Sequence, residues 1–223
     1  MGFMSALMRI DIYSDTVCPW CFLGKKRFEL ALAERPYYEP RVTWRPFELN
    51  PDIPWDGVER AGFLAAKVGD AARVATMEET LVRLGLEIGI KFRFDLIQRV
   101  PNSRRSHLLI AHAARRGRQG AVKDRVMQAY FQEGVDIGDL EELVRLGVET
   151  GLSERDTRAA LVLREGQDGV VAAERHAGAL GISAVPTYIF DGQYTLSGAQ
   201  EPANLAKVFD QVAEFAAARE ATS

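Results

Sequence analysis

The chain contains two cysteines, Cys18 and Cys21, which lie three positions apart in the motif Cys-Pro-Trp-Cys. An alternating apolar run at 8–13 predicts a strand before the motif, and the composition of 22–34 predicts a helix that ends before Pro36. Two cysteines so close in sequence close too short a loop to stabilise the chain by a disulfide. We therefore interpret this pair as a centre of thiol chemistry rather than a structural cross-link.

The position of the motif at the start of a predicted helix suits disulfide exchange, which needs an attacking thiolate, a resolving thiol and access for a partner. The free N–H groups and the dipole of the helix favour negative charge on Cys18, so we expect its pKa to be lowered. Pro19 is compatible with the first helical turn, where its missing N–H is not needed. We predict that Cys18 is the exposed nucleophile and Cys21 the resolving thiol, with Pro19 and Trp20 in the active-site loop.

A zinc site is the main structural alternative for a Cys-x-x-Cys motif. Structural zinc usually takes four ligands, and this chain has no second such motif. Two of its three histidines, His107 and His112, lie about 140° apart around a predicted helix, so they do not present one face to a metal. We predict no metal site and no required cofactor.

The charge and hydropathy of the chain exclude several classes of protein. The formal net charge of −3 does not indicate a nucleic-acid partner. No segment has the roughly 20 consecutive apolar residues that would span a membrane, and residues 1–8 lack the basic region of a secretion signal. We expect a cytoplasmic protein that is a monomer or a homodimer.

The order of the predicted elements defines a fold class. A second strand is predicted at 41–49, and six helices follow at about 59–68, 70–88, 103–117, 119–133, 139–150 and 153–163. A helix at 169–180, strands at 185–190 and 193–196 with an Asp-Gly turn between them, and a helix at 201–218 complete the chain. This order predicts an α/β thioredoxin fold with an inserted all-helical domain. The thioredoxin-like domain would comprise 8–55 plus 165–220, and the inserted domain 56–164.

A second candidate site element is the dipeptide Val185-Pro186 at the start of a predicted strand. Together with the upstream cysteine motif, it predicts a cis-proline loop that faces the two thiols and leaves backbone groups of Val185 free to pair with an extended substrate. The sequence identifies no buried carboxylate near the motif. Asp11 and Asp15 are the nearest acids, and we expect both to be solvated or to cap a turn.

Several segments resemble the FrnE-like proteins, a cytoplasmic branch of the DsbA family. The resemblance is carried by 14–24 (SDTVCPWCFLG), 101–107 (PNSRRSH), 184–187 (AVPT) and 197–200 (SGAQ), and it extends from about residue 8 to 215. It implies a protein disulfide oxidoreductase that acts on thiol- or disulfide-containing proteins or small molecules, with thioredoxin or glutathione as recycling partners. It also implies that a substrate or glutathione cleft is bordered by Asn102, His107, Ser197, Gly198 and Gln200.

Two other functions are compatible with the same architecture. It is similar to kappa-class glutathione transferases and 2-hydroxychromene-2-carboxylate isomerases, which have serine at the position of Cys18 and use glutathione. The alternative function is therefore a glutathione-dependent isomerase or transferase acting on an aromatic or polyketide-like substrate. A redox-gated binding protein or chaperone is the third hypothesis. Cys21 favours disulfide exchange, because only that chemistry needs a resolving thiol.

Overall fold

A four-stranded mixed sheet forms one half of the protein, for which the computed structural model describes residues 8–220. The strand order is β2-β1-β5-β6, where the strands are β1 (Arg9–Ser14), β2 (Arg41–Pro46), β5 (Thr187–Phe190) and β6 (Tyr194–Ser197). β1 runs parallel to β2 and antiparallel to β5, so β1 is central and its apolar side chains are buried. The carboxyl end of β1 leads directly to the cysteine motif.

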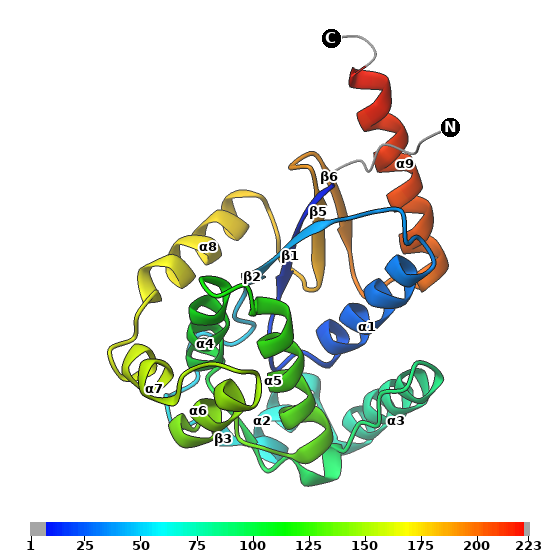
Figure 1. The fold of residues 1–223 in the computed structure, drawn as a ribbon. Helices are drawn as coiled ribbons and strands as arrows, with labels where there is room; N and C mark the ends of the chain where they lie inside the picture. The colour runs from blue at the N-terminus through cyan, green and yellow to red at the C-terminus, as the bar shows by residue number, and fades with distance from the viewer. Residues whose placement is uncertain (1–7, 221–223) are drawn as a thin grey trace.

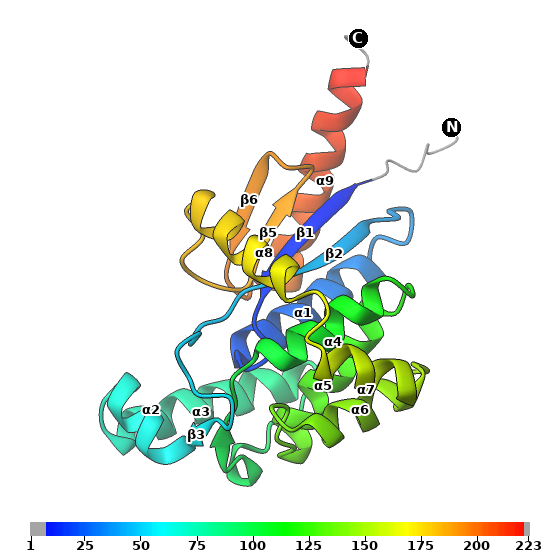
Figure 2. The same ribbon diagram turned by 90° about the vertical axis from the view of Figure 1, so that its left-hand side faces the viewer.

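Helices cover both faces of this sheet, as Figures 1 and 2 show. The helices α1 (Pro19–Ala33) and α9 (Pro202–Glu220) lie on one face, and α8 (Gln167–Ala179) lies on the other. On the first face, the ring of Phe28 packs against those of Tyr188 and Phe209, with centroids 5.8 and 5.5 Å away. This apolar layer fixes α1, and with it the cysteine motif, against the sheet.

The segment between β2 and α8 is mostly helical and lies beyond one end of the sheet (Figure 1). Its helices are α2 (Arg60–Val68), α3 (Ala71–Glu87), α4 (Arg104–Ala114), α5 (Gln119–Glu133), α6 (Leu140–Glu149) and α7 (Glu154–Val162). The six helices predicted from the sequence are therefore present. A small strand pair, β3 (Val58–Glu59) with β4 (Arg99–Val100), and a 3-10 turn, η1 (Phe94–Leu96), were not predicted, because each is too short to show a periodic pattern.

The helical segment contacts the sheet directly along the edge strand β2. The backbone N–H of Trp44 donates to Oε1 of Gln119 at 3.0 Å, and Nε2 of Gln119 donates to the carbonyl of Trp44 at 3.0 Å. The side-chain amide of Gln119 thus occupies the position of a further strand and satisfies backbone groups of the edge. This contact brings the start of α5 close to the sheet.

The ends of the elements differ from the prediction by a few residues. The helix α1 begins at Pro19 rather than at 22, which places Cys18 at its N-cap and Cys21 in its first turn. The helix predicted to reach 117 ends at Ala114, and Gly117 follows with a φ of +68°, which glycine adopts without strain. None of the helices within 8–220 combines the length and the apolar character needed to cross a membrane.

Candidate active site

The two cysteines lie at the start of α1 as free thiols. Cys18 is the N-cap residue, and its carbonyl accepts the backbone N–H groups of Cys21 at 3.0 Å and Phe22 at 3.2 Å. Cys18 is only 4% exposed and Cys21 only 1%. The prediction of an exposed Cys18 is therefore wrong for this reduced form, whereas the neighbouring Trp20 is exposed.

The loop before β5 lies across the first thiol and accounts for its burial. The Val185–Pro186 peptide bond is cis. Sγ of Cys18 is 3.8 Å from the carbonyl oxygen of Val185, within the range of a weak thiol hydrogen bond. Residues 167 positions apart in sequence thus meet at the redox motif.

The turn at 197–200 packs against this loop and is hydrogen-bonded to it. The backbone N–H of Gly198 donates to the carbonyl of Pro186 at 2.7 Å, and the Ser197 hydroxyl lies 3.1 Å from that of Thr187. Nε2 of Gln200 donates to the carbonyl of Ser197 at 2.8 Å. The turn predicted to border a glutathione cleft is therefore next to the cis-proline loop, and its binding of glutathione stays a prediction.

A glycine allows α1 to pack closely on the same loop. A Cβ atom on Gly24 would lie 2.8 Å from Cγ of Pro186 and 2.8 Å from the hydroxyl oxygen of Tyr188. It would also lie 3.4 Å from Cα of Ala199. Real Cβ atoms essentially never come as close to another heavy atom as the two 2.8 Å distances, so the position of Pro186 against α1 depends on the missing side chain of Gly24.

A pocket of about 360 Å³ opens beside Cys18, and we call it the thiol pocket. Cys18, Pro19 and Trp20 form one wall, and apolar side chains of the helical segment form the other, among them Phe63, Leu64, Met77, Phe94, Tyr130 and Phe131. Cys21 does not line this pocket. Access to the redox pair from this side is therefore through Cys18 alone.

A buried carboxylate lies beneath the motif, contrary to the expectation for Asp15. This side chain is 0% exposed; its Oδ2 accepts the backbone N–H of Leu49 at 2.7 Å, and its Oδ1 lies 3.2 Å from Nε2 of His107. Burial alone would raise the pKa of Asp15, but the hydrogen bonds from His107 and Leu49 outweigh it, so the pKa is lowered. Asp11, by contrast, forms a partly exposed ion pair with Arg45, as a solvated acid would.

Two residues that the family resemblance placed at a cleft form hydrogen bonds inside the protein instead. Nδ2 of Asn102 donates to the carbonyl of Ile53 at 2.6 Å, and its Oδ1 accepts the backbone N–H of Arg104 at 3.0 Å. His107 is buried against Asp15. Neither lines the thiol pocket. Within 8–220, no three His, Cys, Asp or Glu side chains gather as metal ligands.

The sequence analysis missed a buried lysine of α5. Lys123 is 1% exposed, and within the described part of the chain it forms no ion pair; its ammonium lies 5.1 Å from the ring centre of Trp44. Burial lowers its pKa to about 8. The sequence did indicate that this lysine is buried, because Lys123, Met127 and Tyr130 are spaced i, i+4, i+7 and so lie on one buried stripe of their helix.

The pKa values of the two thiols shift in opposite directions, contrary to the expectation for Cys18. Its pKa is raised, because its thiol donates a hydrogen bond to Cys21 and because it is buried near the negative charges of Cys21 and Asp15. Burial opposes ionisation of Cys21, but the hydrogen bond from Cys18 and the positive charge of Lys123 contribute to lowering its pKa. These effects outweigh the helix N-terminus, which favours charge on Cys18.

The sequence matches the family described as DSBA-like thioredoxin domain over residues 9–210. The chain belongs to this family. This DSBA-like protein is 31% identical over 193 residues to "Uncharacterized protein YwbO" of Bacillus subtilis (strain 168), covering 86% of this chain and 90% of that one. The crystal structure of a probable DsbA oxidoreductase, SCO1869 of Streptomyces coelicolor, is 34% identical and superposes with a TM-score of 0.84, covering 92% and 89% of the two chains.

More distant structures share the fold of this DSBA-like protein. A 2-hydroxychromene-2-carboxylate isomerase has a TM-score of 0.68 at 17% identity, covering 96% of this chain and 99% of that one. The cytosolic disulfide reductase DsbM of Pseudomonas aeruginosa, solved with GSH, has a TM-score of 0.65 at 19% identity, covering 91% and 98%. The thioredoxin-like α/β fold and the DsbA-family resemblance predicted from the sequence are thus confirmed.

Proposed function

We propose that this protein is a thiol–disulfide oxidoreductase whose redox centre is the pair Cys18 and Cys21. The observation that carries the proposal is the placement of Cys18 at the N-cap of α1 and Cys21 in its first turn, with Cys18 against the cis-proline loop and, of the two thiols, alone on a pocket. A nucleophile needs access, and a resolving thiol needs only to reach the nucleophile. The likeness to a probable DsbA oxidoreductase supports the same function.

The proposed cycle uses the hydrogen bond between the two thiols. The Cys18 thiol passes its proton to the Cys21 thiolate and attacks one sulfur of a substrate disulfide, so that one substrate thiolate leaves and a mixed disulfide forms. Cys21 then loses its proton and attacks the sulfur of Cys18, which releases the second substrate thiolate. Cys18 and Cys21 end as a disulfide, the substrate has gained two electrons, and the reverse sequence oxidises a dithiol.

The thiol pocket indicates which substrates the centre would accept. Its walls are mainly apolar and aromatic, so we infer an apolar group next to the reacting sulfur. Two cations lie on it: Arg60 is paired with Glu78, whereas the ammonium of Lys67 is bonded to the neutral amide of Asn50. A disulfide with an apolar body and a nearby acidic group would match these features, whether on a protein or a small molecule.

The partners and the setting belong to the same proposal. Either a thioredoxin or glutathione would return the Cys18–Cys21 pair to its starting redox state. The chain has no cysteine outside this pair and therefore no structural disulfide, which is typical of proteins of the reducing cytoplasm. For a polypeptide substrate, the backbone of Val185 would pair with an extended segment beside Cys18.

The test is a redox titration of the protein in a series of glutathione buffers. We expect a reversible two-electron transition between roughly −120 and −270 mV. At each glutathione ratio, alkylation of the free thiols and mass spectrometry measure the fraction of protein that is oxidised. Cys21→Ser should lose this transition and instead accumulate a mixed disulfide with glutathione at Cys18.

Two results would contradict the proposal. The first is that no disulfide between Cys18 and Cys21 forms at any glutathione ratio. The second is that Cys21→Ser keeps full activity on a glutathione-linked aromatic substrate, which would favour an isomerase or transferase like the 2-hydroxychromene-2-carboxylate isomerase of the same fold.

A further inference from the structure

A second pocket, of about 300 Å³, opens between β2, α4, α5 and α8, and we call it the Lys123 pocket. Neither cysteine lines it, so it is separate from the thiol pocket. Its volume lies at the lower end of the range of small-molecule sites in proteins. The proposed redox cycle gives this pocket no role.

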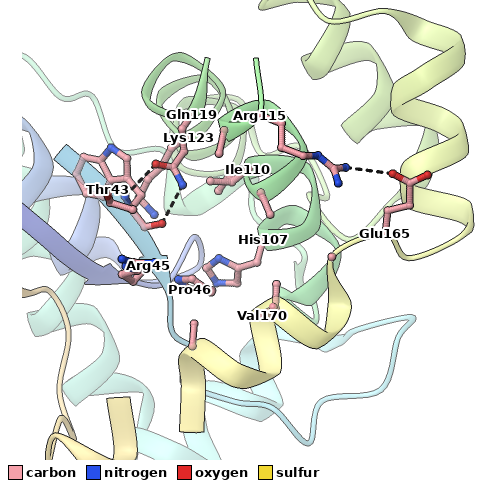
Figure 3. A pocket seen from close by; sticks show the side chains of 16 residues that line it. Thr43, Arg45, Pro46, His107, Ile110, Arg115, Gln119, Lys123, Glu165 and Val170 are labelled. Carbon is pink, nitrogen blue, oxygen red and sulfur yellow. Dashed lines mark hydrogen bonds and ion pairs between the residues drawn. The ribbon is translucent and has the colours of Figure 1, made fainter. Parts of the chain in front are cut away.

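Apolar side chains form much of the lining of the Lys123 pocket. The ring of Trp44 from β2, Ile110 from α4 and Val170 from α8 line it, together with alanines of both helices. Figure 3 shows the side chains of α4, α5 and α8 that surround it. An apolar lining with a small number of polar groups is typical of a site for a small organic molecule.

The lysine and arginine side chains that line the pocket differ in their partners. Arg115 forms an ion pair with Glu165 at 3.1 Å, which is drawn in Figure 3, and Arg45 forms one with Asp11 at 2.7 Å. Lys123 forms no hydrogen bond and no ion pair with any residue of 8–220. The pocket therefore has one cation that no acid neutralises.

Other buried cations in the described part of the chain are paired with acids. Lys25 is 3% exposed and pairs with Glu29, and Arg27 is 4% exposed and pairs with Glu201. Lys123 is buried more deeply than either, at 1% exposed. Since a buried charge without a partner lowers the stability of a protein, the exception at this pocket points to a missing acid.

The contacts that Lys123 does make compensate its charge only in part. Its ammonium lies 5.1 Å from the ring centre of Trp44, which is a cation–π contact. The charges of Cys21 and Asp15 also act on it, but the oxygens of Asp15 are already bonded to other groups. Burial lowers the pKa of Lys123 only to about 8, so the ammonium is the main form near neutral pH.

We propose that the Lys123 pocket binds a small carboxylate with an apolar body. The ammonium donates a hydrogen bond to the carboxylate, which gives the buried cation its missing acid. The apolar body packs against Trp44, Ile110 and Val170. A small inorganic anion would leave these apolar walls uncovered, and a neutral molecule would leave the ammonium without a counter-ion. Binding here does not depend on the two thiols, which lie outside this pocket.

Naphthoate, an aromatic monocarboxylate, is a suitable probe, because the three tryptophans of the chain report where it binds. Trp44 lines the Lys123 pocket, Trp20 lines the thiol pocket and Trp55 lines neither. In a titration followed by NMR of the nitrogen-labelled protein, we expect the indole N–H signal of Trp44 to move and then saturate. The signals of Trp20 and Trp55 should not move, and one phenylalanine variant of each tryptophan assigns the three signals.

Two comparisons test whether the charge of Lys123 is recognised. Naphthamide has the same aromatic body without the charge, and it should bind about 30-fold more weakly than naphthoate. Lys123→Met should weaken the binding of naphthoate by about 30-fold as well, and should leave that of naphthamide nearly unchanged. Lys25→Met is the matched control, because it removes the other ammonium near Trp44, which lies outside the pocket, and should keep the affinity of wild type.

A second pair of variants tests the location of the site by filling it. Gly169 lines the Lys123 pocket on α8, and a Cβ atom there would meet no heavy atom within 4 Å. Gly169→Leu adds a side chain to the lining without a clash at its Cβ, and we expect it to abolish the movement of the Trp44 signal. Gly178 of the same helix is equally unhindered and lies outside the pocket, so Gly178→Leu should bind naphthoate like wild type. Circular dichroism verifies that each variant is folded.

Three results would overturn the proposal. The first is movement of the Trp20 signal without that of Trp44, which would place the probe in the thiol pocket. The second is equal affinity for naphthoate and naphthamide; this comparison uses the wild type, so it decides even if Lys123→Met does not fold. The third is an absence of saturable movement of the Trp44 signal at millimolar naphthoate, or its persistence in Gly169→Leu.

Discussion

Replacement of Asp15 by alanine is expected to lower the free energy of unfolding by about 3–5 kcal/mol, because it breaks a fully buried polar cluster. The variant would leave the backbone N–H of Leu49 without its acceptor at 2.7 Å and the buried His107 without its partner at 3.2 Å. Urea unfolding monitored by circular dichroism measures the change. Asp15→Asn, which keeps one acceptor oxygen, should have an intermediate effect.

Asp11 provides a matched control for this measurement. It lies four residues earlier, and its ion pair with Arg45 at 2.7 Å is partly exposed to solvent. Asp11→Ala should change the free energy of unfolding by no more than about 1 kcal/mol. Equal losses for the two variants would show that the Asp15 cluster contributes no more than a surface ion pair.

The contribution of Asp15 also has a defined pH dependence. Its pKa in the folded protein lies below the reference value of 3.8, so the folded state binds fewer protons than the unfolded state in the interval between the two. The stabilisation is therefore fully present above the unfolded-state pKa and is lost as pH falls through the lower folded-state pKa. The difference between wild type and Asp15→Ala should be constant near neutrality and should narrow only below about pH 4.

Gly24→Val is expected to destabilise the protein by about 3 kcal/mol and to slow disulfide exchange at least tenfold. The new Cβ would lie 2.8 Å from both Cγ of Pro186 and the Tyr188 hydroxyl, so α1 and the cis-proline loop would have to separate. This movement would change the contact between the Cys18 thiol and the Val185 carbonyl. Thermal unfolding measures the loss of stability. The rate at which Cys18 releases the first coloured thiolate from dithiobis(nitrobenzoate), an aromatic disulfide, measures the loss of exchange activity.

A glycine elsewhere distinguishes this close contact from a general effect of glycine substitution. Gly178 lies within α8, and a Cβ atom there would meet nothing within 4 Å. Gly178→Ala should stabilise the helix by roughly 0.5–1 kcal/mol and leave the exchange rate unchanged. A stable and fully active Gly24→Val protein would show that the loop position does not depend on this contact.

The parts of the structure that were predicted correctly are those encoded by local patterns. The helix after Cys18 follows from the position of Pro19 and the composition of 22–34, and the hairpin after Pro186 follows from its turn residues. The helical segment was recognised from apolar spacing. Such signals are contained within one element and need no knowledge of its neighbours.

The features that were missed depend on contacts between distant elements. Asp15 is buried because the loop at Leu49 and the helix of His107 enclose it, and no local pattern around Asp15 shows this. Cys18 is buried because residues 167 positions later lie against it. Lys123 could have been suspected from its place on an apolar stripe, but its relation to Cys21 depends on how two helices pack.

The origin of Lys123 has a consequence for how proteins of this architecture can diverge. The thiols belong to the helix that follows the central strand, whereas this lysine belongs to a helical segment inserted after the second strand. Changes in the packing of α5 would alter the electrostatic environment of Cys21 without any substitution in the Cys-Pro-Trp-Cys motif. Two homologues with identical motifs can therefore differ in redox behaviour, and comparison of their inserted helices is the place to look for the reason.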